Sequence, residues 1–310
     1  MNRRDQSTAR VTIGLAVYNG VTYLEEAINS ILAQTFENYE LIIVDNASTD
    51  STAALCESYA ERDRRISYYR NYENIGGARN ENLTVLLARG EYFRWAAHDD
   101  YLEPTLLERC VAVLDQNPAV VLCYSQVKQI DEVSGRVTMV SRNNAASERP
   151  ACRFRKLLLS KDFLEETYGL MRLDVLRATS LQQNYVASDR TLMAELSLYG
   201  RFYEVPEPLF VKRFHRKNAY TDWRSRIAWF KPDSAPAVNF PWWAQLKDII
   251  ETVFRLPVPA AVSLECLATA CIWAIMRSPN LAKDLVMAAL SKASGAESRA
   301  RKFAESQNWH

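Results

Sequence analysis

The chain has 310 residues, of which 48 % are apolar, enough for one large domain or one domain with a smaller appendage. Its 38 Lys and Arg balance 37 Asp and Glu. The net charge of +1 therefore gives no reason to expect a nucleic acid partner, which selects a basic surface. The six cysteines form no Cys-x-x-Cys pair, and we expect buried free thiols in a reducing compartment.

Residues 1–10 are polar and lack the apolar core of a secretory signal, so we expect a flexible N-terminus on a cytoplasmic protein. Residues 258–276 are mostly apolar but include Pro259 and Glu265. Because a central charge is costly in a membrane-spanning helix, we expect a buried or half-buried helix here. A peripheral contact with the inner face of the membrane is the alternative.

Strands and helices alternate through the first 125 residues. Short apolar runs predict the strands, and apolar residues at helical spacing predict the helices. In chain order they are strand 11–18, helix 22–34, strand 41–44, helix 49–62, strand 66–69, helix 78–88, strand 92–96, helix 103–116 and strand 120–124. This alternation predicts a doubly wound, mostly parallel α/β sheet, which binds ligands beyond the carboxyl ends of its strands.

The pattern changes after residue 124. A turn at 132–136 between two β-rich runs predicts a hairpin over 126–140, and a polar loop follows at 143–149. We then expect helices at 156–168 and 189–199 and an extended segment at 202–214. Residues 220–240 are irregular and rich in Trp and Pro, 241–293 are predicted to be helical, and 294–310 form a polar tail.

Two segments that follow predicted strands carry side chains suited to a nucleoside. In residues 16–20 (AVYNG), Tyr18 can stack on a base. In residues 44–50 (VDNASTD), Asp45 can accept hydrogen bonds from a pyrimidine or from ribose hydroxyls. An Asp after a strand is more often only a helix cap, so this segment alone does not define a site.

Two further segments suit a diphosphate and a cation. Residues 74–80 (NIGGARN) combine glycines at a helix start with Arg79, which lets N–H groups and a guanidinium approach an anion. Residues 96–100 (AAHDD) end in Asp99 and Asp100, and adjacent carboxylates at a strand end are typical of Mg²⁺ or Mn²⁺ shared with phosphates. Alone, each is more often a turn or a solvated loop, but their order on successive strand ends favours one ligand site.

The segments VTIGLAVYNG, LIIVDNASTDST, NIGGARN and GEYFRWAAHDDYLEPTLLE together resemble family 2 glycosyltransferases of the GT-A fold, over about residues 10–215. The resemblance implies an inverting transfer of a sugar from a nucleoside diphosphate donor, often a UDP-sugar, to a hydroxyl of a saccharide or lipid-linked acceptor. The usual setting is polysaccharide or glycoconjugate synthesis. It implies a Rossmann-like nucleotide-sugar-binding half (11–125) and an acceptor-binding, catalytic half (126–220). Residues 221–293 then form a C-terminal helical extension.

By position, the resemblance assigns Tyr18 and Asp45 to the base and ribose, and Arg79 to the base or phosphate. The full set of donor-binding candidates is Ala16, Tyr18, Asn19, Asp45, Asn74, Gly76, Arg79, His98 and Asp99. Asn46 stands where many members have a second Asp, which is a mild departure from the family pattern.

The acidic turn would be the family's site for Mn²⁺ or Mg²⁺. Many members read Asp-x-Asp-Asp there, but this chain has Ala97 at the first acid. Asp99 is then the expected direct ligand with Asp100 in support, and strand alternation points His98 away. Related enzymes complete the site with a later His, which makes His215 a candidate ligand; a structural or surface His is the alternative.

Inverting transfer needs a carboxylate that takes the proton of the acceptor hydroxyl. The resemblance places this base at Asp189, for which a helix N-cap is the alternative, and Glu195 is the fallback. Arg213, Arg216 and Lys217 are candidates for stabilising the leaving diphosphate, or they form a solvated basic loop. Residues 143–168 and the Trp-rich stretch 223–243 would shape the acceptor pocket.

Two other functions stay open. A nucleotidyltransferase shares the fold type but usually has a Gly-rich, basic loop after the first strand, where this chain has Tyr-Asn-Gly. A non-catalytic nucleotide or sugar binder with a degenerate metal site is supported only by Ala97. The C-terminal helices would pack on the catalytic domain, form a homodimer or touch the membrane.

Overall fold

In the computed structural model, the described residues are 9–142, 145–161, 164–215, 240–256 and 258–289. The chain forms two compact units, residues 1–233 and residues 234–310. The predicted boundary between residues 125 and 126 lies inside the first unit, where both halves contribute to one sheet. The predictions for residues 216–239, and for the tail at 294–310, lie outside the described residues.

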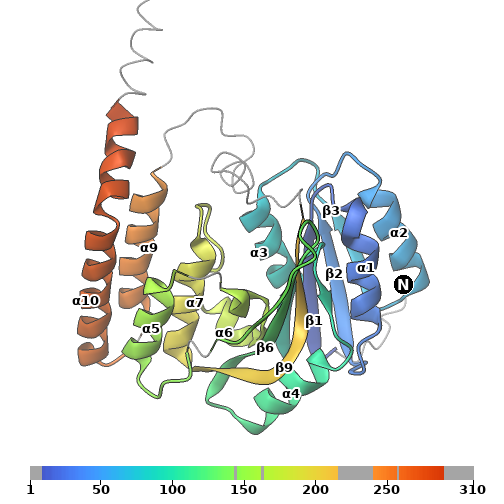
Figure 1. The fold of residues 1–310 in the computed structure, drawn as a ribbon, viewed down its shortest axis with the longest axis horizontal. Helices are drawn as coiled ribbons and strands as arrows, with labels where there is room; N and C mark the ends of the chain where they lie inside the picture. Colours follow the sequence, from blue (N-terminus) through green and yellow to red (C-terminus); the bar gives the residue numbers. More distant parts are fainter. Residues whose placement is uncertain (1–8, 143–144, 162–163, 216–239, 257, 290–310) are drawn as a thin grey trace, which may run out of the picture. The chain divides into compact units, whose positions relative to one another are not determined.

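Within the described residues, the first unit is built on a nine-stranded sheet in the order β3-β2-β1-β4-β8-β6-β9-β5, with β7 paired to β6 (Figure 1). Its parallel part agrees with the first four predicted strands: β1 (Val11–Val17), β2 (Tyr39–Asp45), β3 (Ile66–Arg70) and β4 (Tyr92–Ala96). Strands β2 and β4 are buried along their whole length. Cover on both faces explains why their sequences show no polar alternation.

Helices cover both faces of this parallel part (Figure 1). Helices α1 (Val21–Leu32), α2 (Thr52–Arg62) and α4 (Leu106–Gln116) share one apolar core with β1 and β2. Helix α3 (Gly77–Leu87) lies on the other face, and Gly14 of β1 allows its close approach. A Cβ atom at Gly14 would lie 2.4 Å from Oγ1 of Thr84, so a larger residue would push the helix away.

Two helices begin later than predicted. Helix α2 starts at Thr52, whose N–H donates to Oδ1 of Asp50 at 3.0 Å, so Asp50 satisfies a free donor at this helix start. Helix α4 starts at Leu106 because the residues before it form β5 (Tyr101–Leu102), which pairs antiparallel with β9. Local spacing does not predict so short a strand.

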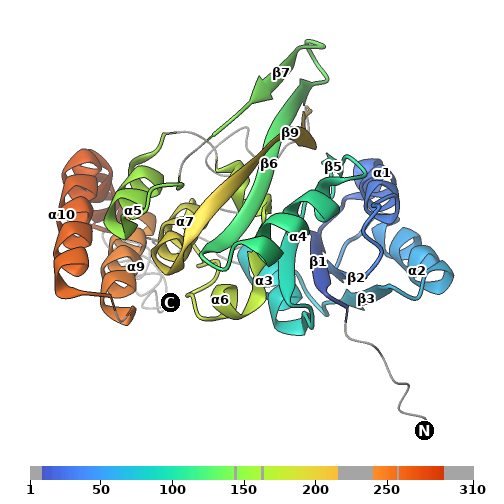
Figure 2. The same cartoon turned by 90° about the horizontal axis from the view of Figure 1, so that it is seen from below.

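The second half of the sheet differs from simple alternation. Strand β8 (Leu170–Arg172) runs antiparallel between β4 and β6 (Val120–Asp131), and β9 (Arg201–Phe214) then lies parallel to β6. The predicted strand at 120–124 is thus the start of a longer strand that is not the neighbour of β4. The predicted hairpin is confirmed, because β7 (Val137–Val140) pairs antiparallel with the far end of β6 (Figure 2).

The helix predicted at 156–168 is wrong. The chain instead forms α5 (Pro150–Leu159) and, after an interruption, the short 3₁₀ helix η1 (Glu165–Tyr168). Pro150 lies in the first turn of α5, where its fixed φ and missing N–H are tolerated, and this favours the earlier start. Helices α6 (Leu173–Arg177) and α7 (Ser188–Tyr199) follow, and α7 confirms the helix predicted at 189–199.

The second unit is helical where it is described, as predicted for residues 241–293. Its helices are α9 (Pro241–Arg255), α10 (Ala260–Met276) and a helix at Ser278–Ala289. No single described helix has the length and composition to cross a membrane, although α10 and the helix after it, bent by 63°, meet that requirement as a pair. The cysteine prediction is wrong for Cys152 and Cys271, which are exposed.

Candidate active site

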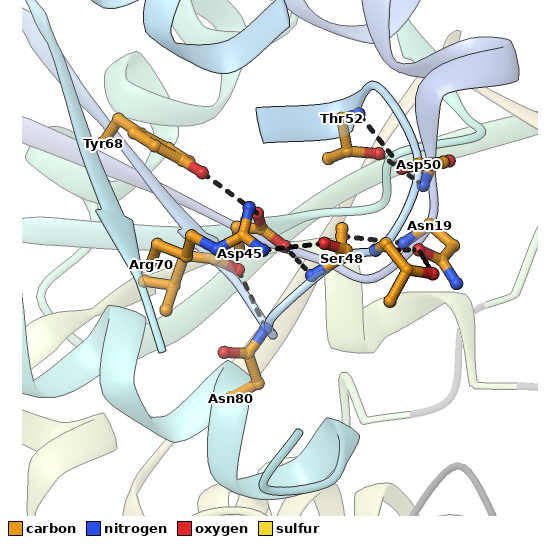
Figure 3. A network of polar contacts seen from close by, with 11 residues as sticks. Asn19, Asp45, Ser48, Asp50, Thr52, Tyr68, Arg70 and Asn80 are labelled. Carbon is orange, nitrogen blue, oxygen red and sulfur yellow. Dashed lines mark hydrogen bonds and ion pairs between the residues drawn. The ribbon is translucent and has the colours of Figure 1, made fainter. Parts of the chain in front are cut away.

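The loops after β1 and β2 are held together by hydrogen bonds (Figure 3). The Asn19 N–H donates to Oγ of Ser48 at 2.9 Å, and the Thr49 N–H donates to Oδ1 of Asn19 at 2.8 Å. Asn19 and Ala47 both have a positive φ, a strained backbone conformation that the surrounding contacts hold in place. Beside them, the exposed ring of Tyr18 is free of the core and can meet a base.

Asp45 lies at the end of β2 and is fully buried. It accepts hydrogen bonds from the Ser48 N–H at 2.8 Å and the Tyr68 hydroxyl at 3.0 Å, and Nη1 of Arg70 lies 3.4 Å away (Figure 3). Its contact with the donor stays a prediction. Tyr68 and Arg70 were missed because they reach Asp45 only through the pairing of β2 with β3. Arg70 is half exposed and so adds a cation at this edge.

A set of asparagine side chains links the second and third loops. Oδ1 of Asn74 accepts from Nδ2 of Asn46 at 2.7 Å and from the Gly76 N–H at 3.0 Å, while Oδ1 of Asn46 accepts from the Ile75 N–H at 2.9 Å. Asn46 therefore donates and accepts at once, which a carboxylate cannot do. This accounts for the departure from Asp at position 46.

Gly76 has a φ of +87°, a conformation that favours glycine, and it turns the chain into helix α3. The first N–H groups of this helix have no intrahelical acceptor and form a natural anion site. Arg79 is exposed in the first turn. These features are compatible with the donor contacts predicted for Gly76 and for Arg79, at the base or the phosphate, and those contacts stay predictions.

The acidic turn lies beside the first loop. The ring of His98 packs against Gly20, where a Cβ atom would lie 2.7 Å from Cδ2 of His98. Asp100 is buried and accepts from the Arg213 N–H at 2.8 Å. Burial and the charge of Asp99 raise the pKa of the Asp100 carboxyl to about 7. Asp100 thus ties the acidic turn to strand β9, and its supporting role at a metal stays a prediction.

The structure brings the two predicted metal ligands together. Nε2 of His215 lies 3.1 Å from Oδ2 of Asp99, although 116 positions separate them in the chain. Both side chains are largely shielded from solvent. Within the described residues, no group of three His, Cys, Asp or Glu side chains is close enough to hold a metal.

Side chains from distant segments of the chain pack around His215 and orient its ring. The Tyr23 ring packs against the His215 ring at a tilt of 34° with centroids 4.4 Å apart, and the Tyr23 hydroxyl donates to Glu132 at 2.8 Å. Arg213 lies over Tyr23 and forms ion pairs with Glu26 at 2.7 Å and Glu132 at 3.4 Å. Arg213 is thus buried and holds Tyr23 and the two glutamates in place. It was predicted to stabilise the leaving diphosphate or to lie in a solvated basic loop, and neither role describes these contacts. Arg216 and Lys217 lie outside the described residues.

Asp189 lies in the first turn of α7, but the helix N-cap is Ala187, in the left-handed region with φ +68°. Asp189 is therefore not the N-cap residue, although its carboxylate accepts from the Arg190 N–H in the first turn. Burial raises the pKa of the Asp189 carboxyl, and the charges of Arg190 and Lys212 oppose this. Glu195, the fallback candidate for the base, is buried and accepts from Ser180 Oγ at 2.7 Å. Its carboxylate therefore holds the loop at Ser180 in place.

The loop before Asp189 is bound to helix α3. Nδ2 of Asn82 donates to the Gln182 carbonyl at 2.8 Å, and the Gln182 N–H donates back to Oδ1 of Asn82 at 3.1 Å. Oγ of Ser188 then donates to Oε1 of Gln182 at 2.7 Å. Burial, aided by the charge of Asp189, raises the pKa of Glu81 to about 8. Asn82 and Glu81 adjoin the NIGGARN segment, but only the fold shows that Glu81 lies near Asp189 and that Asn82 binds the loop before it.

The family model of glycosyl transferase family 2 matches residues 12–175, which include the four loops but neither Asp189 nor His215. The chain belongs to glycosyl transferase family 2. An uncharacterised glycosyltransferase of Haemophilus influenzae is 28 % identical over 66 % of this chain and 65 % of that protein. One of Rickettsia typhi is 34 % identical over 44 % of this chain and 42 % of that protein. The chain thus matches less than two thirds of the length of these relatives.

Solved structures share the GT-A fold at low sequence identity. Residues 1–349 of Staphylococcus aureus TarS, solved with UDP-GlcNAc, align with a TM-score of 0.66 at 16 % identity over 89 % of this chain and 79 % of that one. The mannosyltransferase PcManGT of Pyrobaculum calidifontis, solved with GDP-Man and Mn²⁺, aligns with a TM-score of 0.54 at 16 % identity over 98 % and 82 %. The predicted GT-A fold of this family 2 member is thereby confirmed.

Proposed function

We propose that this family 2 member is an inverting glycosyltransferase that moves a sugar from a nucleoside diphosphate donor, first of all a UDP-sugar, to an acceptor hydroxyl. The observation that carries the proposal is the 3.1 Å approach of Asp99 and His215 at the edge of the sheet that bears the donor loops. Family membership argues against a nucleotidyltransferase. One structural neighbour was solved with UDP-GlcNAc and another with GDP-Man. The identity of the donor's nucleobase therefore needs a direct test.

The residues at the acidic turn fit a divalent cation. Carboxylate oxygen and imidazole nitrogen are both accepted by Mn²⁺, and carboxylate is preferred by Mg²⁺. Oδ2 of Asp99 and Nε2 of His215, which lie 3.1 Å apart, would hold the cation. When bound, the cation offsets the charge that develops on the leaving diphosphate.

The donor would lie across the loops after β1, β2 and β3. Tyr18 offers an exposed ring for the base, and the polar edge around Asp45 includes the half-exposed Arg70. The start of α3 and Arg79 suit the diphosphate through N–H donors and a positive charge. These side chains bind and orient the donor so that its anomeric carbon faces the acceptor side.

Asp189 would act as the base on the acceptor side. As the acceptor oxygen attacks the anomeric carbon, its proton passes to the Asp189 carboxylate and the bond from that carbon to the diphosphate oxygen breaks, with inversion. A carboxylate whose pKa is raised by burial is a stronger base than one in water. We further propose a saccharide or lipid-linked acceptor in polysaccharide or glycoconjugate synthesis and a cytoplasmic location, both on family resemblance alone.

The test is a screen of UDP-, GDP- and dTDP-sugars for hydrolysis or transfer, with Mn²⁺, with Mg²⁺ and with excess EDTA. We expect turnover of a UDP-sugar that needs the cation and is lost in Asp99→Asn. Asp63→Asn is the matched control, because Asp63 pairs with Arg65 far from the donor loops. Full activity in EDTA would refute the metal role, and no turnover of any donor would favour the non-catalytic binder.

A further inference from the structure

Glu81 carries a partly buried carboxyl that the fold leaves without a partner. It lies on α3, one turn after the start of the helix at Gly77. Its backbone is fixed, because its carbonyl accepts from the Thr84 hydroxyl at 2.6 Å and from Nε1 of Trp95 at 3.2 Å. Among the described residues, however, none gives its side chain a hydrogen bond or an ion pair. Since buried polar groups are normally hydrogen-bonded, this carboxyl is available to a ligand.

The surroundings of Glu81 place it where α3 approaches the proposed base. Burial and the charge of Asp189 raise the pKa of the Glu81 carboxyl to about 8, so the two carboxyls lie close together. The next residue, Asn82, exchanges two hydrogen bonds with Gln182 in the loop before Asp189. These bonds fix the separation between α3 and the loop that carries the base.

The transferred sugar must lie in this same region. In an in-line displacement, its anomeric carbon lies between the leaving diphosphate oxygen and the attacking acceptor oxygen, whose proton goes to Asp189. The diphosphate is proposed to bind at the start of α3, one turn before Glu81. A sugar ring between the diphosphate and the base therefore passes the part of α3 that carries Glu81.

The chemistry of the Glu81 carboxyl suits a sugar hydroxyl. Near pH 7 it is mostly protonated, because its pKa lies above that value. A neutral carboxyl donates one hydrogen bond and accepts others, as a hydroxyl group does. It also adds no negative charge beside Asp189 and the diphosphate. An enclosed polar group that pairs with a substrate hydroxyl rejects analogues that lack it, because the group is then left unpaired.

We propose that Glu81 binds a hydroxyl group of the transferred sugar and thereby selects which sugar the enzyme accepts. The inference rests on the proposed function, from which it takes the positions of the diphosphate and the base. It gives a role to a side chain that belongs neither to the predicted donor-binding set nor to the predicted catalytic residues.

Calorimetry with Mn²⁺ tests the proposal by separating the sugar from the nucleotide. The probes are UDP and whichever of UDP-glucose, UDP-galactose, UDP-GlcNAc and UDP-GalNAc the wild type binds most tightly. In Glu81→Leu, the affinity for this UDP-sugar should fall about tenfold, as expected when an enclosed hydrogen bond is lost, while UDP affinity stays within about twofold. Glu81→Gln keeps a donor and an acceptor and should bind both probes like the wild type. Glu61→Leu, at an exposed position in the last turn of α2, is the matched control.

Deoxy analogues of the same UDP-sugar provide a second measurement. Each analogue lacks one hydroxyl of the sugar. Loss of the hydroxyl that Glu81 binds should weaken binding to the wild type about tenfold and should not weaken binding to Glu81→Leu any further. A purely structural role of Glu81 would not produce this dependence on one hydroxyl.

Two results would overturn the proposal and leave the proposed function intact. Glu81→Leu could bind the UDP-sugar as tightly as the wild type, which would mean that Glu81 does not contact the sugar. It could also weaken UDP and the UDP-sugar equally and lower the melting temperature, which would make Glu81 a structural residue of α3. If the wild type bound neither UDP nor any nucleotide-sugar, the proposed function itself would fail, and this inference with it.

Discussion

The loops proposed to bind the donor and the side proposed to bind the acceptor are assembled in different ways. The loops from Asn19 to Gly76 are fixed by short hydrogen bonds among asparagine, serine and threonine residues at adjacent strand ends. Asp189 and His215 instead arrive from α7 and from the end of β9, whose positions depend on the insertion of β8 and the long pairing of β6 with β9. Sequence motifs therefore predict the loops from Asn19 to Gly76 directly. They predict Asp189 and His215 only through the resemblance to the family.

The largest loss of activity should come from changing Asp189, the proposed catalytic base. Asp189→Asn should lower kcat by about 10²–10⁴-fold, because a positioned base contributes that much to proton transfer. UDP affinity, measured by calorimetry with Mn²⁺, should stay within about twofold. Asp174→Asn, at an exposed position on α6, is the control. If UDP binding disappeared together with turnover, Asp189 would serve donor binding. The proposed division into donor loops and an acceptor side would then be wrong.

The next largest effect should be on UDP affinity. It comes from changing His215, which lies beside Asp99 at the proposed metal site. His215→Ala should weaken UDP binding at least about tenfold in the presence of Mn²⁺, as expected when a metal site loses an imidazole donor. Without the cation, the variant and the wild type should bind UDP alike. Equal UDP affinity of the two proteins in Mn²⁺ would return His215 to a structural role beside Tyr23.

A smaller effect should follow from cutting the contact between α3 and the loop before α7. Asn82→Ala removes both hydrogen bonds to Gln182 and should lower kcat about tenfold, since two such bonds contribute about 1–3 kcal/mol. The KM for the donor should change little, because Asn82 acts through the position of Asp189. A rise in KM at constant kcat would show that Asn82 serves donor binding instead.

The last prediction concerns the free energy of unfolding and its dependence on pH. The pKa of Glu81 is raised from 4.5 to about 8, so the folded state holds a proton there that the unfolded chain releases. Stability should therefore fall as pH rises from about 4.5 to about 8 and then level off. Melting curves of Glu81→Gln should lose part of this decline. If the curves of the variant and the wild type ran parallel across that window, Glu81 would be ionised in the fold.

The sequence by itself determined the parallel strands β1 to β4, the helices between them, and the loops that carry Tyr18, Asp45, Gly76 and Asp99. Hydrophobic period and strand ends are local properties, and in a parallel sheet they fix which loops share an edge. The same local rules failed at 156–168, where α5 ends at Leu159 and η1 begins at Glu165.

Only the tertiary structure decided what those residues do to one another. It buried Asp45 under Tyr68 and Arg70, put Arg213 between Glu26 and Glu132, and placed Asp189 in the first turn of α7 and not at its N-cap. It also brought His215 to 3.1 Å from Asp99. Contacts across more than a hundred residues depend on strand pairing and side-chain packing, and neither leaves a trace in a local pattern.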